Sequence, residues 1–203
     1  MTGQPIILRH TYTRSRDTAR AGLRYYQMRP RGDDEPPRSI FGAEGTMARD
    51  EAYRLLDAHQ AGSGAGGQAH GYLAHRLMLS PPEDLRPDDL RDLTRHVMRE
   101  LERDKGQRLH WVAVEHRNTA HPHVHIVLAG GAGEGHCREL RLDRGDHARI
   151  KEDGLDYCRL TARVRDDWDR ALAAATREAD AGRPGREAVT PPIHGRDEGW
   201  ERG

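Results

Sequence analysis

The chain has 203 residues, and its 33 basic and 33 acidic side chains give a formal net charge of zero. Hydrophobic residues make up 35% of the sequence and charged residues 33%, against about 45–50% and about 25% in an average globular domain. No apolar stretch reaches the ~18 residues that a membrane-spanning helix needs, and residues 1–10 show no secretory signal. The two cysteines, Cys137 and Cys158, cannot form a disulfide scaffold, so we expect a cytoplasmic protein without membrane contact.

The zero net charge conceals an uneven distribution along the chain. Residues 1–32 contain seven arginines and one acidic residue, Asp17, so this end has a charge of +6. All but two of the 33 basic residues are arginine, whose planar guanidinium matches a phosphate group. A high arginine content can also reflect the base composition of a genome. The basic N-terminal end indicates a local anionic partner.

Taken in chain order, the first part of the sequence predicts a strand, a helix and a region rich in loops. A strand over 6–12 leads to a helix that Ser15 or Asp17 would cap and Pro30 would end. Three further elements follow from composition and spacing: a loop over 30–45, a helix over 46–60 and a flexible glycine-rich linker over 61–67.

The second part predicts the centre of a sheet and two longer helices. Alternation over 72–80 indicates a strand with Leu77 and Leu79 on its apolar face. The later elements are expected in this order: a helix over 87–104, strands over 109–116 and 123–129, a loop over 130–135, a short strand over 139–142 and a helix from Asp143 to about Asp180 with a break at Gly154. The pattern predicts an α+β fold, with a central, mostly antiparallel β-sheet flanked by helices. We expect one domain over residues 1–182 and a disordered tail over 183–203.

Four of the 13 histidines fall within ten residues, at positions 116, 121, 123 and 125. In a strand, His123 and His125 project from one face, while Val124 and Ile126 face the core on the other. His116 ends the preceding strand, so a hairpin would bring it beside them. Three imidazoles with open coordination positions are typical of a catalytic metal site. A single strand histidine is more often a packing or hydrogen-bonding residue, so this interpretation depends on the clustering.

Two other histidines are expected to have different roles. His121 precedes Pro122 and should lie in the loop, as a bystander or an outer residue of the site. His75 lies on the apolar face of its strand and should pack or form hydrogen bonds. A carboxylate from Glu83 or Glu115 could add a ligand, but alternation places Glu115 on the face opposite His116.

The segment Trp111-Val-Ala-Val-Glu-His-Arg-Asn-Thr-Ala-His-Pro-His-Val-His125 resembles the His-hydrophobic-His motif of plasmid mobilization relaxases, in its MobA/VirD2-type version. The strand that ends in Ser80 is also similar to a strand of that family. The resemblance covers residues 5 to about 180 and implies the same α+β fold. Two features differ: Asn118 stands where the family often has Asp, and Leu128-Ala-Gly130 stands where many members have Asn.

Relaxases nick one DNA strand at a transfer origin and stay attached to it through a tyrosine. The pattern Leu23-Arg-Tyr25 looks similar to the family's nucleophile helix, which places Tyr25 at the position of the nucleophile. Tyr26 points about 100° away on a helix and is the second candidate. Both tyrosines could instead be packing residues of an amphipathic helix. Nearby arginines are candidates for binding the DNA backbone, namely Arg20, Arg24 and Arg29.

The resemblance implies a divalent metal, Mg or Mn, whereas imidazole ligands alone favour metals such as Zn. It also implies single-stranded DNA at a transfer origin as substrate, a 5′-phosphotyrosyl intermediate that can be religated, and accessory mobilization and coupling proteins as partners in conjugation. Two alternatives remain open. One is a rolling-circle replication initiator or transposase of the same superfamily, and the other is a non-catalytic, metal-stabilised DNA-binding module.

Overall fold

The computed structural model describes residues 5–29, 36–61, 74–83, 89–117, 119–129, 132–133, 136–137 and 140–181. Most of the predicted linker, the predicted tail and Asn118 lie outside these residues. The chain divides into two compact units, Met1–Val164 and Arg165–Gly203. The sheet and the histidine cluster belong to the first unit.

Six strands form one antiparallel sheet with the order β1-β4-β6-β5-β2-β3. Their bounds in that order are Ile7–Thr13, Ala74–Ser80, His123–Ala129, His110–His116, Ile40–Phe41 and Thr46–Met47. A separate two-stranded sheet consists of β7 (Ala132–Gly133) and β8 (His136–Cys137). The long strands β4, β6 and β5 lie side by side at the centre, so the β5–β6 hairpin with its histidines occupies the middle of the sheet.

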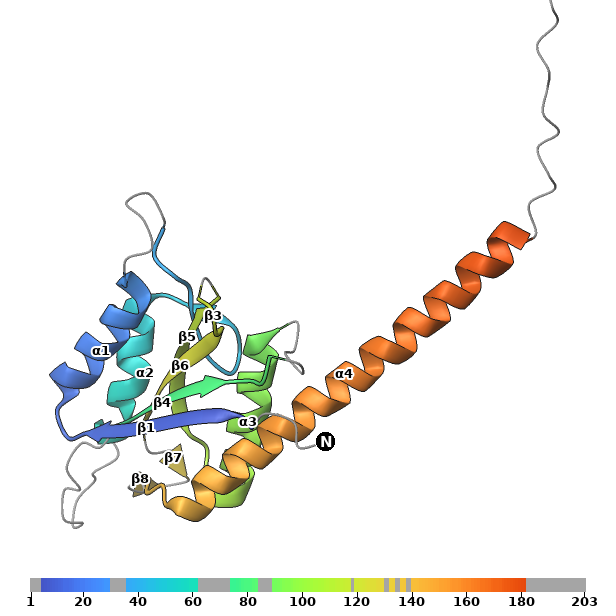
Figure 1. Cartoon of the computed structure of the whole chain (residues 1–203). Coiled ribbons are helices and arrows are strands. Elements are labelled where there is room, and N and C mark those ends of the chain that lie inside the picture. The colour runs from blue at the N-terminus through green and yellow to red at the C-terminus, as the bar shows by residue number, and fades with distance from the viewer. Residues whose placement is uncertain are drawn as a thin grey trace, which may run out of the picture. The chain divides into compact units, whose positions relative to one another are not determined.

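In the described residues four helices accompany the sheet: α1 (Arg16–Met28), α2 (Arg49–Ala61), α3 (Leu90–Lys105) and α4 (Arg144–Ala181). Helices α1 and α2 cover one face, and α3 covers the other (Figure 1). The first turns of α4, up to Cys158, pack with α3 in the same core. The architecture confirms the predicted α+β class with an antiparallel sheet. None of the described helices is long and apolar enough to cross a membrane.

Strand alternation decides which side of the sheet receives the histidines. In β6, Val124, Ile126 and Leu128 are buried in the core beneath α3. Val127 and Ala129 point to the opposite core, beneath α1 and α2. Because His123 and His125 share the parity of Val127, they face α1 and α2.

Local sequence signals fix the ends of α1 and α3. The Ser15 hydroxyl accepts a hydrogen bond from Thr18 N–H at 3.2 Å, so Ser15 is the N-cap of α1, as one of the two predicted alternatives had it. At the other end of α1, Arg29 N–H donates to Tyr25 O. Helix α3 begins after the Asp89 cap and ends at Gly106, whose φ of 61° is the left-handed conformation that glycine adopts most readily.

Two predictions for the first part of the chain were wrong. The predicted loop over 30–45 contains β2, which pairs with Val114 and Ala113 of β5. The predicted helix over 46–60 begins only at Arg49, because residues 46–47 form β3 and pair back on β2. Gly42 N–H donates to Gly45 O in the turn between them, and Gly45 has a φ of 152° that few other residues tolerate. Such two-residue strands are too short to leave an alternating pattern in the sequence.

Two predictions near the start of α4 were also wrong. Residues 140–142 of the predicted strand over 139–142 have no strand partner among the described residues; β7 and β8 form just before them. Helix α4 continues through Gly154 without the predicted break. A Cβ at position 154 would lie 3.3 Å from Ile6 Cδ1 and 3.5 Å from Val97 Cγ2. Gly154 therefore allows α4 to approach the core closely, and tertiary packing outweighs its weak helix propensity.

Candidate active site

The β5–β6 hairpin brings the three predicted histidines together. His116 of β5 pairs directly with His123 of β6. His125 lies two residues further along β6, opposite Val114. Each of the three offers a ring nitrogen, and these atoms lie within 4.8 Å of one another. His116 is buried, whereas His123 and His125 are partly exposed. The strand geometry thus confirms the predicted juxtaposition of the three rings.

Hydrogen bonds to backbone carbonyls define which ring nitrogens carry protons. His116 Nε2 lies 2.9 Å from Tyr26 O, and His123 Nδ1 lies 2.8 Å from His121 O. A carbonyl only accepts, so each of these nitrogens must donate. The lone pairs of the neutral rings are then at His116 Nδ1 and His123 Nε2. These are the nitrogens available to a metal.

The histidine cluster fits a divalent cation. His116 Nδ1 is buried and has no hydrogen-bond partner among the described residues, which is unfavourable for a lone pair unless something binds it. His123 Nε2 lies 3.2 Å from His125 Nε2. Two nitrogens that each lie about 2.0–2.1 Å from one ion are separated by roughly 3.0–3.4 Å. The observed spacing and the orphaned Nδ1 therefore suit three ligands of one ion.

Burial keeps two of the rings neutral. Desolvation lowers the pKa of His116 to about 4, against the opposing effect of its hydrogen bond to Tyr26. Desolvation and then the neighbouring His116 and His123 lower the pKa of His125 to about 3. Both rings are uncharged at neutral pH, which is the form that binds a metal.

The C-terminal turn of α1 packs directly on the histidines. The Tyr26 ring stacks on the His125 ring, with centroids 3.9 Å apart and an interplanar angle of 3°. Its carbonyl accepts the His116 proton, so Tyr26 contacts two of the three histidines. Desolvation raises the pKa of its phenol above the ordinary value, and the charge of Arg76 opposes this.

Tyr25 occupies a different position from its neighbour. Its side chain is 57% exposed, and its ring centroid lies 6.1 Å from that of Tyr26. The structure therefore places one candidate tyrosine against the histidine rings and the other beside it, open to solvent.

The three predicted DNA-binding arginines have different surroundings. Arg29 follows the last residue of α1, and its charge lowers the pKa of His116 and His125 after the larger effect of burial. Arg24 is exposed on α1. Arg20 forms an ion pair with Asp57 of α2 and lies over the Tyr53 ring, with its guanidinium carbon 5.2 Å from the centroid. Arg20 thus joins α1 to α2.

Two further arginines lie near the site and were missed from the sequence. Arg38 donates from Nη1 to Arg29 O at 2.8 Å, and its charge also lowers the pKa of His116 and His125. Arg76 of β4 is half-buried and near the Tyr26 phenol. Arg38 follows a Pro-Pro pair in a predicted loop. Arg76 alternates with leucines, so its pattern indicates a solvent-facing residue.

Several residues hold the histidine hairpin in place. The buried Ser80 hydroxyl donates to Pro122 O at 2.9 Å, which ties the end of β4 to the loop before His123. His121 is exposed, pairs with Glu83 at 2.9 Å and contributes its carbonyl to His123. Glu115 forms ion pairs with Arg91 and Arg117 on the face opposite His116, as alternation predicted. His75 is buried and lies 2.9 Å from Leu140 O, which confirms its predicted hydrogen-bonding role.

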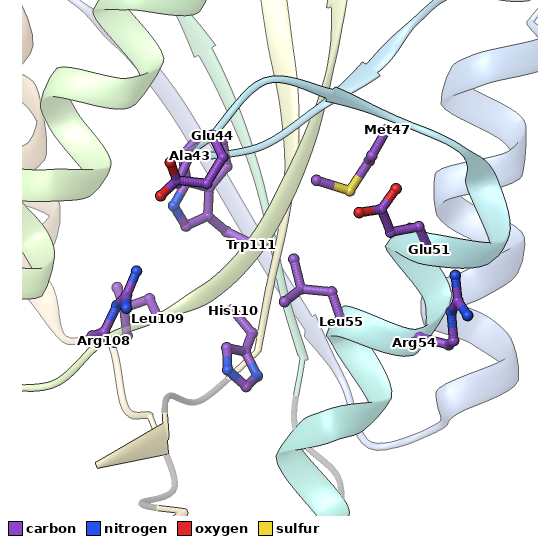
Figure 2. Close-up of a pocket in the computed structure, with 10 residues that line it drawn as sticks. All are labelled: Ala43, Glu44, Met47, Glu51, Arg54, Leu55, Arg108, Leu109, His110 and Trp111. Carbon is purple, nitrogen blue, oxygen red and sulfur yellow. The ribbon is translucent and has the colours of Figure 1, made fainter. Parts of the chain in front are cut away.

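A pocket of about 740 Å³ lies at the other end of β5 from the histidines. Figure 2 shows side chains entering it from α2, from the start of β5 and from the β2–β3 turn. His110 lines it and lies six positions before His116 in β5, or about 20 Å away along the strand. The pocket is therefore distinct from the histidine cluster.

Three histidines on a central hairpin, beneath a helix that bears two tyrosines, form the kind of site that the sequence resemblance implies for a DNA-nicking enzyme. Residues 42–136 match the family model of the relaxases, described as "Relaxase: MobA/VirD2-like, nuclease domain". The match confirms the resemblance over these residues, which make up just under half of the chain. The matched residues include all three histidines, whereas α1 with Tyr25 and Tyr26 precedes them. No curated protein matches the chain.

Proposed function

We propose that this protein nicks single-stranded DNA at a transfer origin by tyrosine transesterification and can rejoin the strand, as part of conjugative mobilization. The observation that supports this best is the docking of α1 on the histidine cluster. Tyr26 contacts His125 through its ring and His116 through its carbonyl, and the Tyr25 ring centroid lies 6.1 Å from that of Tyr26.

We assign the nucleophile to Tyr25 and a positioning role to Tyr26. A nucleophile must reach a phosphate that arrives from solvent, and the Tyr25 side chain is the exposed one of the pair. The Tyr26 ring is held face to face with His125, and its raised pKa makes its phenolate harder to form. Tyr26 therefore fixes the helix on the histidines, while Tyr25 remains free to attack.

The proposed reaction exchanges one phosphodiester for another. The Tyr25 oxygen attacks the scissile phosphorus, the phenolic proton passes to solvent, and the bond from phosphorus to the 3′-oxygen breaks. The products are a free 3′-hydroxyl, which takes up a proton, and a 5′-phosphotyrosyl bond. Because the number of phosphodiester bonds is unchanged, the 3′-hydroxyl can reverse the reaction and seal the strand.

His116, His123 and His125 would hold the metal, which supplies polarisation of a non-bridging phosphate oxygen and stabilisation of developing charge. His116 would bind through Nδ1 and His123 through Nε2, the nitrogens whose protons are absent in the neutral rings. Three imidazoles favour Zn or Mn, and water or phosphate oxygens would be needed to complete a shell that suits Mg. We propose Mg or Mn as the metal during catalysis, with oxygen ligands from the DNA.

Arginines near the cluster would bind the DNA backbone. The charges of Arg29 and Arg38 both lower the pKa of His116 and of His125, so the two arginines lie near these rings. Arg24 is exposed and directly precedes Tyr25. Guanidinium groups bind phosphate oxygens in a bidentate manner, so these residues suit the phosphates that flank the scissile bond. Arg20 would contribute less, because Asp57 already neutralises it.

A nicking assay on a labelled single-stranded oligonucleotide with a candidate transfer-origin sequence and Mn tests the proposal. We expect a covalent protein–DNA band on a denaturing gel, lost in Tyr25→Phe and after addition of a chelator. Tyr26→Phe should keep the adduct, because the phenyl ring can still stack on His125. Adduct formation by Tyr25→Phe but not by Tyr26→Phe would reverse the assignment. Tight DNA binding without any adduct would instead favour a non-catalytic module.

The choice of DNA distinguishes a relaxase from a rolling-circle initiator or transposase of the same superfamily. A rolling-circle initiator or transposase would form the same adduct with a replication origin or a transposon end. Oligonucleotides of the three kinds, compared at equal concentration, therefore test the transfer-origin part of the proposal independently of the chemistry.

A further inference from the structure

Arg76 of β4 carries a positive charge that no residue in the described part of the chain neutralises. Its side chain is half-buried, and its Nε is buried without a hydrogen-bond partner among the described residues. Arg20, by comparison, is paired with Asp57. A guanidinium that has lost part of its hydration and gained no partner is unfavourable in the free protein. Binding of an anion would offset this cost.

The register of the sheet places Arg76 beside the histidine cluster. Arg76 pairs with Val127 of β6, and Met78, two residues along β4, pairs with His125. Paired residues of antiparallel strands share a face, so Arg76 and His125 are diagonal neighbours on the face that α1 covers. Diagonal neighbours are about 7–8 Å apart, which is within reach of a long side chain.

Gly22 of α1 leaves room for the Arg76 side chain beneath the helix. A Cβ at position 22 would lie 3.5 Å from Arg76 Cδ and 3.7 Å from Arg76 Nη1. Tyr26 lies one turn further along α1. Burial raises the pKa of the Tyr26 phenol, and the charge of Arg76 opposes this effect, so the guanidinium lies near the phenol.

A second arginine continues from Arg76 toward the edge of the sheet. Arg9 of β1 pairs with Met78, so it lies on the same face as Arg76 and His125. Strand β1 is an edge of the sheet, and the Arg9 side chain is exposed. Two strand spacings, or about 10 Å, separate the backbones of β1 and β6. Arg38 lies on the other side of the cluster, in the segment before β2, so arginines flank the histidines on both sides.

We propose that Arg76 binds the DNA phosphate next to the scissile phosphate, on the β1 side of the histidine cluster, and that Arg9 binds a phosphate further along the same strand of DNA. This inference rests on the proposed nicking function. The DNA then crosses the sheet from the β2 side to the β1 edge, past the C-terminal end of α1. Guanidinium groups bind phosphate oxygens through paired, charge-assisted hydrogen bonds, which are stronger where water is partly excluded.

The first test measures the affinity for a labelled single-stranded oligonucleotide by fluorescence anisotropy, with EDTA present so that no strand is nicked. We expect Arg76→Gln to weaken binding at least about tenfold, as for loss of a hydrogen bond between charged groups. The slope of log affinity against log salt concentration should become less steep by about 0.7, the value for one phosphate contact in a single strand. Arg99→Gln is the matched control, because it removes the same charge from an exposed position of α3, on the opposite face of the sheet. Its affinity and salt slope should match those of the native protein.

Replacement of single phosphates by uncharged methylphosphonates identifies the partner of each arginine. Arg76→Gln should abolish the effect of the methylphosphonate next to the nick position and leave the effects of the others unchanged. Arg9→Gln should do the same at a position further from the nick in the same direction. Effects of Arg76→Gln that add to those of every methylphosphonate would overturn the contact. Coupling of Arg9 and Arg76 to opposite sides of the nick would overturn the path of the DNA.

Urea unfolding separates a role in binding from a role in folding. Because the charge of Arg76 has no partner among the described residues, Arg76→Gln should unfold at the same urea concentration as the native protein or at a higher one. A lower midpoint, with an equal loss of affinity for every methylphosphonate, would show a structural role and overturn the proposal. DNA binding without coupling at Arg76 would overturn this inference alone. A native chain with no affinity for single-stranded DNA would overturn the proposed function as well.

Discussion

Replacement of His116 by glutamine or by alanine separates the roles of its two ring nitrogens. Nε2 donates to Tyr26 O at the end of α1, and Nδ1 is the orphaned lone pair. The terminal amide of glutamine can place a donor near the position of Nε2 but offers nothing at the position of Nδ1. Alanine removes both. The two variants therefore have different effects on folding and the same effect on the metal.

The magnitude follows from burial. In His116→Ala, a carbonyl at the α1 terminus loses its donor, which costs about 1–3 kcal/mol, and removal of a buried ring leaves a cavity. We expect a total loss of about 2–4 kcal/mol from the free energy of unfolding of the metal-free protein. His116→Gln should lose less than about 1 kcal/mol. With an m value of about 2 kcal/mol/M, the alanine variant should unfold in urea at a midpoint about 1–2 M lower.

Urea unfolding with EDTA, followed by circular dichroism, measures the loss of folding stability. Calorimetric titration with Mn measures the loss of metal affinity. Both variants should show Mn affinity reduced by at least tenfold, because both lack the Nδ1 ligand. Equal destabilisation of the two variants would show that the bond to Tyr26 O does not stabilise the fold. Native Mn affinity in His116→Gln would show that Nδ1 is not the ligand.

Three further predictions concern the stability of the fold. Ser80→Ala should destabilise the protein by about 1–3 kcal/mol in urea and weaken Mn binding, because Pro122 O loses its donor and the loop before His123 loosens; unchanged values for both would refute this. Burial, then His75 and His147, lowers the pKa of His10 from 6.5 to about 4, so the unfolded chain binds the proton more tightly and stability should fall as pH drops from about 6.5 to 4. Because His10 is partly exposed, solvent screens some of this effect. Between pH 6.5 and 4 we expect His10→Gln to lose roughly 1–2 kcal/mol less of its free energy of unfolding than the native protein, and equal pH profiles would contradict this. Gly106→Ala should cost about 1 kcal/mol in thermal or urea unfolding, because alanine tolerates the φ of 61° poorly, and no change would refute the strained cap.

The histidine site was largely predictable because two local rules determine it. Alternation in β6 puts His123 and His125 on one face, and a short loop between two apolar strands makes a hairpin that returns His116 to them. The same alternation correctly separated Glu115 from the cluster. Both rules use neighbours in sequence, so no knowledge of the tertiary fold was needed.

The surroundings of the site were not predictable in the same way. The contact between Tyr26 and His125 depends on how α1 packs across the sheet, and the two residues are far apart in the chain. Arg38 approaches the rings because the segment before β2 returns toward the end of α1. The unbroken course of α4 through Gly154 also depends on contacts with Ile6 and Val97, which override local propensity. Long-range packing decides all three.

Identification of the residue that becomes attached to DNA tests the central claim most directly. The covalent adduct formed with Mn and a transfer-origin oligonucleotide can be digested with nuclease and trypsin, and the peptide that begins at Tyr25 can be sequenced by tandem mass spectrometry. The account predicts a nucleotide on Tyr25, with Tyr26 unmodified. A nucleotide on Tyr26, or on any residue outside α1, would contradict it.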